Sequence, residues 1–199
     1  MKKIVVYSLL CFVFLGCDSG NTGSAPTPIV NDNQPFDAPA IDNAEKLSYL
    51  DAINTARASE QNCGSEGIKP SVSALMWNDA LYKAAYEHSE DLAESDTFSH
   101  DGSGTNSDWT SQVQNLGRGS TTKERIENNG YVNWSTIGEN VAAGTTTDTA
   151  LEVVQQWLDS PSHCANLMSS NYTEVGMAMV ENANSFYTHY WTQNFGNPQ

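Results

Sequence analysis

Two histidines and one glutamate stand among glycines and small polar residues in the second half of this 199-residue sequence. His100 lies in FSHDGSG, Glu139 in IGENVAAG and His163 in SPSHCANLM. Near neutral pH an imidazole can act as a base, bind a metal or accept a hydrogen bond, and a carboxylate can orient it. Each residue alone is a weak signal. Together they indicate a functional site if folding brings them into one cleft.

His163 has a special position, because Ser160 and Pro161 are typical of the N-cap and the first residue of a helix. An imidazole in the first turn of that helix lies near the positive end of the helix dipole, which disfavours its protonated form. We therefore expect His163 to be neutral near pH 7. Two roles stay open: a chemical one, and a structural one in which the ring bonds a backbone carbonyl and orders the loop.

Glu139 follows Gly138 and precedes a short segment of small apolar residues, so we expect its carboxylate to be either paired or functional. His100 follows the end of a predicted helix and opens a Gly-rich loop, a common place for binding residues. His88 lies on the apolar stripe of that helix, which favours a hydrogen-bonded core histidine over a chemical role. The sequence contains no HExxH, GxSxG, P-loop or dinucleotide-binding motif.

The N-terminus has the pattern of an export signal. Lys2 and Lys3 precede an apolar run that is too short to span a membrane, and a small residue stands directly before Cys17. We expect residues 1–16 to be a lipoprotein signal peptide and Cys17 to be the lipidated first residue; the alternative is ordinary signal cleavage nearby. The expected product is an exported bacterial lipoprotein of the cell envelope, attached to the membrane through Cys17.

Charge and cysteine content narrow the possible functions. The formal net charge is −15, with only nine Lys and Arg residues, so nucleic acid is excluded as a partner. With Cys11 removed in the signal and Cys17 lipidated, Cys63 and Cys164 remain. In an oxidising compartment the simplest interpretation is a disulfide between them. A catalytic thiol and a metal thiolate are the alternatives.

The rest of the chain divides into a linker and one domain. Residues 17–43 are rich in Asn, Asp, Pro, Thr, Ser and Gly, which predicts a flexible linker, and a domain is expected over 44–199. Apolar spacing predicts helices over about 44–59 and 78–94. The Gly, Ser, Thr and Asn content of residues 101–119 predicts a long exposed loop in which Trp109 and Val113 are held against the domain. Capping boxes at Thr121 and Thr149 predict two further helices. Period-two alternation after Tyr172 predicts two antiparallel strands, the first with one buried face, and IGENVAAG flanks a third.

From about Leu47 to Gly196 the ordered motifs resemble the CAP superfamily of cysteine-rich secretory, antigen 5 and pathogenesis-related 1 proteins. Those motifs are NTAR, FSH, RIENNGY, IGENVAAG, SPSHCANLM, NYTEVGMAMV and YWTQNFG. The resemblance implies an α+β fold, a three-layer α-β-α sandwich with a central antiparallel sheet. It also implies a cleft with two histidines and two acidic residues, to which His100, Glu139 and His163 correspond.

The second acidic residue departs from the family pattern. The position that carries it in eukaryotic relatives is Ser160 here. Glu174, in the YTEVG motif typical of the bacterial branch, is the candidate substitute; its alternative role is that of a strand residue bonded to the neighbouring helix. The resemblance also fits a Cys63–Cys164 disulfide that braces the cleft wall. It implies a possible divalent metal, zinc, with His100 and His163 as its ligands.

We therefore expect a CAP-domain protein that binds a lipid, a peptide or a cell-envelope fragment in its cleft. The alternative is a hydrolase in which His100 or His163 activates a water, alone or through a divalent ion, with Glu139 orienting it. No serine or cysteine stands in a recognisable nucleophile motif, apart from Cys164 beside His163.

Overall fold

The computed structural model describes residues 35–199. The predicted signal peptide, Cys17 and most of the predicted linker lie outside the described residues. The helices are α1 (Asn43–Arg57), α2 (Asp79–Ser95), α3 (Trp109–Gln114), α4 (Thr122–Asn128), α5 (Ala150–Leu158) and α6 (Pro161–Leu167), with a 3-10 turn η1 at Gly64–Glu66. The strands are β1 (Gln61–Asn62), β2 (Ile68–Lys69), β3 (Met76–Trp77), β4 (Trp134–Gly144), β5 (Glu174–Glu181) and β6 (His189–Pro198).

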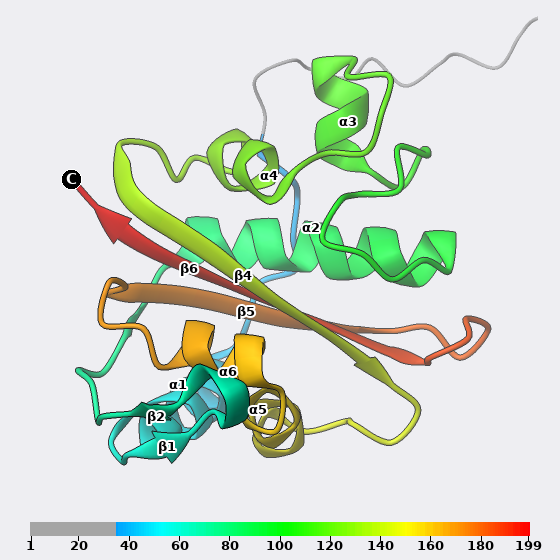
Figure 1. Cartoon of the computed structure of the whole chain (residues 1–199). Helices are drawn as coiled ribbons and strands as arrows, with labels where there is room; N and C mark the ends of the chain where they lie inside the picture. Colours follow the sequence, from blue (N-terminus) through cyan, green and yellow to red (C-terminus); the bar gives the residue numbers. More distant parts are fainter. Residues whose placement is uncertain (1–34) are drawn as a thin grey trace, which may run out of the picture.

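A central sheet of four strands, in the order β3-β5-β6-β4, separates two layers of helices (Figure 1). Helices α2, α3 and α4 lie on one side, and α1, α5 and α6 on the other. The predicted α+β sandwich is confirmed, and the sheet is antiparallel except for the short parallel pair β3–β5. Strands β1 and β2 form a separate antiparallel pair. No helix among residues 35–199 has the length and apolar character needed to cross a membrane.

Strand β5 is buried on both faces, so the prediction of one buried face was wrong. Val175 and Met177 lie in the core beneath the sheet, and Gly176 and Ala178, on the opposite face, are buried as well. The reason is the second helical layer, which leaves no solvated side. At Gly176 a methyl group would overlap the backbone nitrogen of Tyr82, so helix α2 lies directly on the strand.

The long helices and both capping boxes match the sequence predictions. Thr121 and Thr149 each accept a hydrogen bond from the backbone N–H of the glutamate three residues later, whose carboxylate accepts from the threonine N–H. Gly130 follows the C-cap of α4 with φ +95°. Strand β6 begins at His189. The preceding residue, Thr188, adopts a left-handed backbone conformation with φ +65°, which interrupts the extended chain.

The segment 101–119 contains helix α3, which the prediction of a long exposed loop did not include. Val113 is buried, in agreement with the expectation that it is held against the domain. Two buried carboxylates hold this segment in place. Asp91 of helix α2 accepts hydrogen bonds from the backbone and side chain of Ser103, and Asp108 of the segment itself accepts three backbone N–H bonds. Carboxylates in this role shape a loop that its Gly and Ser content would otherwise leave open.

The packed structure begins before residue 44. Phe36 stacks on Tyr86 at 6.2 Å between ring centroids, and its backbone nitrogen donates to Asn129 Oδ1 at 3.0 Å. The carbonyl of Pro39 accepts a hydrogen bond from the Tyr82 hydroxyl at 2.9 Å. The last residues of the predicted linker therefore pack along α2.

Candidate functional site

The structure contains an open cleft of about 440 Å³ beside helix α6 and strand β4. Its lining residues are Glu66, His100, Glu139, Asn140, Ser162, His163, Ala165 and Asn166. The prediction that His100, Glu139 and His163 meet in one cleft agrees with this geometry. Seven of the eight lining side chains are polar, but Glu139, Asn140 and Asn166 form hydrogen bonds within the protein. Glu66, His100, Ser162 and His163 are the polar side chains left to bind a ligand.

Glu139 forms the floor of the cleft, with a side chain only 2% exposed. Its strand β4 pairs with β6 at the sheet edge, so the backbone holds the carboxylate firmly. Oε1 accepts hydrogen bonds from His100 Nδ1 and from the Thr122 hydroxyl, both at 2.9 Å. Oε2 accepts a hydrogen bond from Arg125 Nη2 at 2.9 Å. The carboxylate is therefore paired, as its sequence context predicted.

The charges around Glu139 outweigh the cost of its burial. Burial by itself raises the pKa of the Glu139 carboxyl, but the positive charge of Arg125 and the hydrogen bonds from His100 and Arg125 lower that pKa to about 2. Arg125 is itself 1% exposed and also donates to the carbonyls of Ser120 and His100. Glu139 is consequently ionised at neutral pH and acts as a fixed negative charge.

His100 presents a half-exposed imidazole at the edge of the cleft. The hydrogen bond from Nδ1 to Glu139 raises the pKa of His100, against a smaller opposing contribution from burial. Because Nδ1 is engaged by the carboxylate, Nε2 is the nitrogen left for a ligand or a water. A histidine held by a carboxylate in this manner has a fixed tautomer and orientation, which suits either binding or general base catalysis.

His88 lies directly behind this pair and is completely buried, as the core interpretation predicted. Its Nε2 lies 3.0 Å from the Ser99 carbonyl and 4.0 Å from Glu139 Oε1. Burial and the nearby Arg125 charge lower the pKa of His88 to about 3, so the ring is neutral. It therefore donates from Nε2 to Ser99 and fixes the backbone next to His100. His88 is a positioning residue, a part that its sequence position did not reveal.

His163 lies on the opposite wall, in the first turn of α6, as predicted. The pKa of His163 is lowered, first by burial and then by the charge of His100, so the ring is neutral as expected, with burial as the main cause. Two amides fasten α6 to the floor: Asn166 Nδ2 donates to the Glu139 carbonyl at 3.0 Å, and Asn140 Nδ2 to the His163 carbonyl at 3.3 Å.

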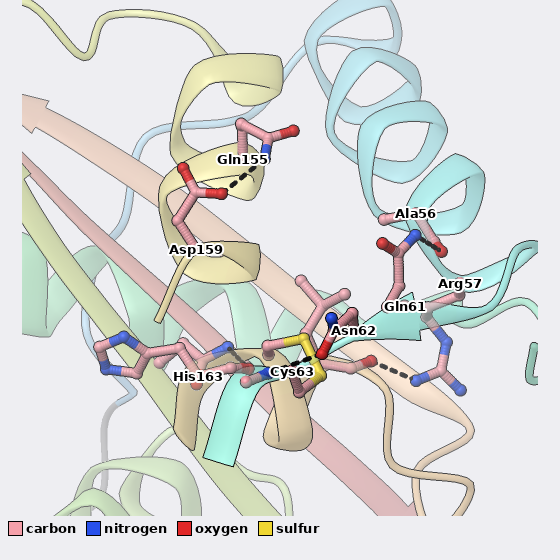
Figure 2. Close-up of a disulfide and its surroundings, with 12 residues drawn as sticks. Ala56, Arg57, Gln61, Asn62, Cys63, Gln155, Asp159 and His163 are labelled. Atoms are coloured by element: carbon pink, nitrogen blue, oxygen red, sulfur yellow. Dashed lines mark hydrogen bonds between the residues drawn. A yellow bond between two sulfur atoms is a disulfide. The ribbon is translucent and has the colours of Figure 1, made fainter. Parts of the chain in front are cut away.

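A disulfide between Cys63 and Cys164 fastens the other side of α6 to the segment after α1. The two Cα atoms are 5.4 Å apart although the residues are separated by 101 positions. Figure 2 shows the His163 ring pointing away from the sulfur atoms. The predicted disulfide is confirmed, so the alternatives of a catalytic thiol and a metal thiolate are wrong. Arg57 adds a further restraint by donating to the Leu167 carbonyl at 2.6 Å.

Glu174 does not line the cleft. It begins strand β5, and its Oε2 accepts a hydrogen bond from the Tyr131 hydroxyl at 2.7 Å. Glu174 is thus a strand residue, as its structural alternative predicted, but its partner Tyr131 lies after the end of α4 and not in a helix. Glu174 therefore does not replace the acidic residue that is missing at Ser160.

The residues of the cleft do not fit a zinc site. Both oxygens of Glu139 are already bonded, and the guanidinium of Arg125 beside Oε2 would repel a second cation. Across residues 35–199 no group of three or more His, Cys, Asp or Glu residues is arranged to hold a metal ion. His100 and His163 alone would leave a zinc ion short of the three or four protein ligands that it usually takes.

Comparisons with known proteins agree with the fold. The family model described as CAP, cysteine-rich secretory protein family, matches residues 50–195. Two relatives come from Bacillus subtilis: the uncharacterized protein YkwD, 26% identical over 178 residues, and the uncharacterized membrane protein YlbC, 30% identical over 155 residues. The matches cover 89% and 78% of this chain. The chain spans only 57% and 35% of the length of those relatives.

Two solved structures have a similar fold. An outer surface protein from Borrelia burgdorferi has a TM-score of 0.57 at 21% identity, over 80% of this chain and 97% of that one. An extracellular protein containing an SCP domain from Bacillus anthracis has a TM-score of 0.53 at 22% identity, over 80% of this chain and 45% of that one.

Proposed function

This chain belongs to the cysteine-rich secretory protein family, and from that membership we propose that it is an exported protein that binds a polar ligand in the cleft beside α6. The observation that carries the proposal is the convergence of His100, Glu139 and His163 on one open cleft. Of the expected ligands, we favour a peptide or a cell-envelope fragment over a lipid, since the imidazoles of His100 and His163 and the carboxylate of Glu66 can form hydrogen bonds with polar groups.

The proposal includes attachment to the membrane through a lipidated Cys17. Support comes from the sequence alone: the basic start, the apolar run and the small residue before Cys17. The attachment is tested by growing cells that express the protein with radiolabelled palmitate and then separating membrane and soluble fractions. Label and membrane association should both disappear in Cys17→Ser, whereas a protein that keeps both in that variant is not anchored there.

One observation favours a hydrolase as the second candidate. His100 is held by an ionised carboxylate through Nδ1, and Nε2 is left to accept a proton from water. His163, neutral on the facing wall, could orient the substrate. With both sulfurs of Cys63 and Cys164 in a disulfide, water is the available nucleophile in this candidate mechanism.

One set of ligand mixtures distinguishes the binding protein from the hydrolase. The purified protein is mixed with a panel of short peptides and soluble cell-wall fragments, binding is followed by calorimetry, and the mixtures are analysed by mass spectrometry. We expect binding that His163→Ala weakens about tenfold. Lys83→Ala, which changes a partly buried residue outside the cleft lining, should leave binding unchanged. Cleavage products that vanish in His100→Ala would establish the hydrolase. Absence of binding and cleavage across the panel would reject both functions.

A further inference from the structure

We propose that Glu66 is the second acidic residue of the cleft and that it contacts the amino group of a peptide ligand. This inference rests on the proposed function and specifies which ligand the site takes. Glu66 lines the cleft together with His163. It stands neither at the family position, Ser160, nor at the candidate substitute, Glu174.

The disulfide explains how Glu66 reaches this position. Glu66 ends the turn η1, which starts one residue after Cys63, and Cys63 is bonded to the residue that follows His163. At Gly64 a built methyl group would lie 3.2 Å from the Pro161 ring, so the turn packs closely against the start of α6. The hydrogen bond from Glu66 N to the Cys63 carbonyl, 3.1 Å long, closes the turn. Glu66 therefore moves with the wall that carries His163.

The charge balance of the lining indicates which group Glu66 would bind. The charge of Glu139 is balanced by Arg125, with which it shares a hydrogen bond of 2.9 Å. Glu66 is exposed, and within residues 35–199 its carboxylate has no hydrogen-bonding or ion-pair partner. No lysine or arginine lines the cleft. When His100 is neutral, the Glu66 carboxylate is unbalanced and favours a cation, and in a peptide with blocked ends that cation is a lysine side chain.

Two matched peptides test this assignment. Ala-Lys-Ala with both ends blocked and the same peptide with the lysine amine acetylated are titrated into the purified protein by NMR, following the His163 ring signals. We expect the free amine to bind about three- to tenfold more tightly, and Glu66→Gln to abolish that difference. Glu60→Gln, an exposed carboxylate on the same connecting segment that does not line the cleft, should preserve it.

The outcomes distinguish this inference from the proposed function. If other peptides or wall fragments bind but the two lysine peptides bind equally, or if Glu66→Gln keeps the preference for the free amine, the inference is overturned and ligand binding stands. If neither the lysine peptides nor the earlier panel of peptides and wall fragments binds, the proposed function fails along with it. Glu66→Gln changes one exposed side chain, so circular dichroism should show an unaltered fold.

Discussion

At the scale of single residues, the central feature is the pair of Arg125 and Glu139, two charges that are almost completely removed from water. A buried ion pair does not by itself add much stability, because desolvation of both groups offsets their attraction. Removal of one partner destabilises the fold strongly, because the remaining charge is left buried without compensation. The pair therefore fixes the geometry of the cleft more than it stabilises the fold.

The substitution Arg125→Met should lower the free energy of unfolding by about 3–5 kcal/mol, because Glu139 loses its balancing charge in a buried site. Denaturant unfolding measures the loss. The matched control is Arg118→Met, which removes an exposed pair with Glu124 and should change stability far less. Equal losses in the two variants would contradict the assigned burial effect.

The substitution Glu139→Gln should lower the pKa of His100. The carboxylate favours the protonated ring through the 2.9 Å hydrogen bond, and an amide carries no such charge. NMR titration of the His100 ring measures the shift, with Glu60→Gln as the control for loss of a distant charge. An unchanged or higher His100 pKa in Glu139→Gln would show that the pair does not exist in solution.

At the scale of elements, helix α2 determines how the sheet packs against the helical layer formed by α2, α3 and α4. It carries His88 toward the cleft, and it packs on strand β5 at Gly176, where a side chain would strike the helix backbone. Contact between two backbones leaves little space for adjustment, because neither partner can turn away as a flexible side chain can.

The substitution Gly176→Ala should consequently destabilise the protein by about 1–3 kcal/mol, and it should broaden the NMR signal of the buried His88 ring as α2 is displaced. Thermal unfolding and NMR spectra provide the measurements. Gly144→Ala in strand β4 is the control, since the closest contact of its methyl group would be the end of the Thr147 side chain, which can rotate. A large loss in the control and none at Gly176 would refute the account of packing.

The sequence predicted elements better than it predicted the site. Capping boxes, Pro161 and the apolar stripes are local signals, so α2, α4, α5 and α6 could be anticipated within a few residues. Arg125 gave no signal, because an arginine in a short polar helix usually faces solvent. Glu66 gave none either, since its place depends on a disulfide that spans 101 positions. Contacts between residues so far apart in the sequence depend on the tertiary fold, and local sequence patterns do not reveal them.

At the scale of the whole molecule, buried titratable groups determine how stability depends on pH. The pKa of His88 is about 3 in the fold against 6.5 ordinarily, and that of Glu139 about 2 against 4.5. Both groups bind more protons when unfolded, so their stabilisation is complete above the ordinary pKa and is lost as the pH falls toward the folded one. Glu87 acts in the opposite direction, with its pKa raised to about 7 by burial.

Below about pH 4.5 the opposing effect of Glu87 ends, since Glu87 is then largely protonated in both states. We expect the free energy of unfolding to fall steeply between about pH 4.5 and pH 3, and guanidinium titrations at a series of pH values measure it. The slope in this window should be shallower in His88→Leu, which removes one of the two proton-binding groups. Identical slopes would show that His88 is not the buried neutral ring assigned to it.

Strand β4 has one further consequence, because it is the long edge strand of the sheet. Its outward carbonyls at Glu139 and Val141 accept hydrogen bonds from the side chains of Asn166 and Trp157. A bare edge of this length is a template for adding a strand from another molecule. Here the Asn166 amide, which fastens the cleft wall, and the Trp157 indole of α5 occupy two of those acceptors, so the packing of α5 and α6 disfavours addition of a strand at this edge.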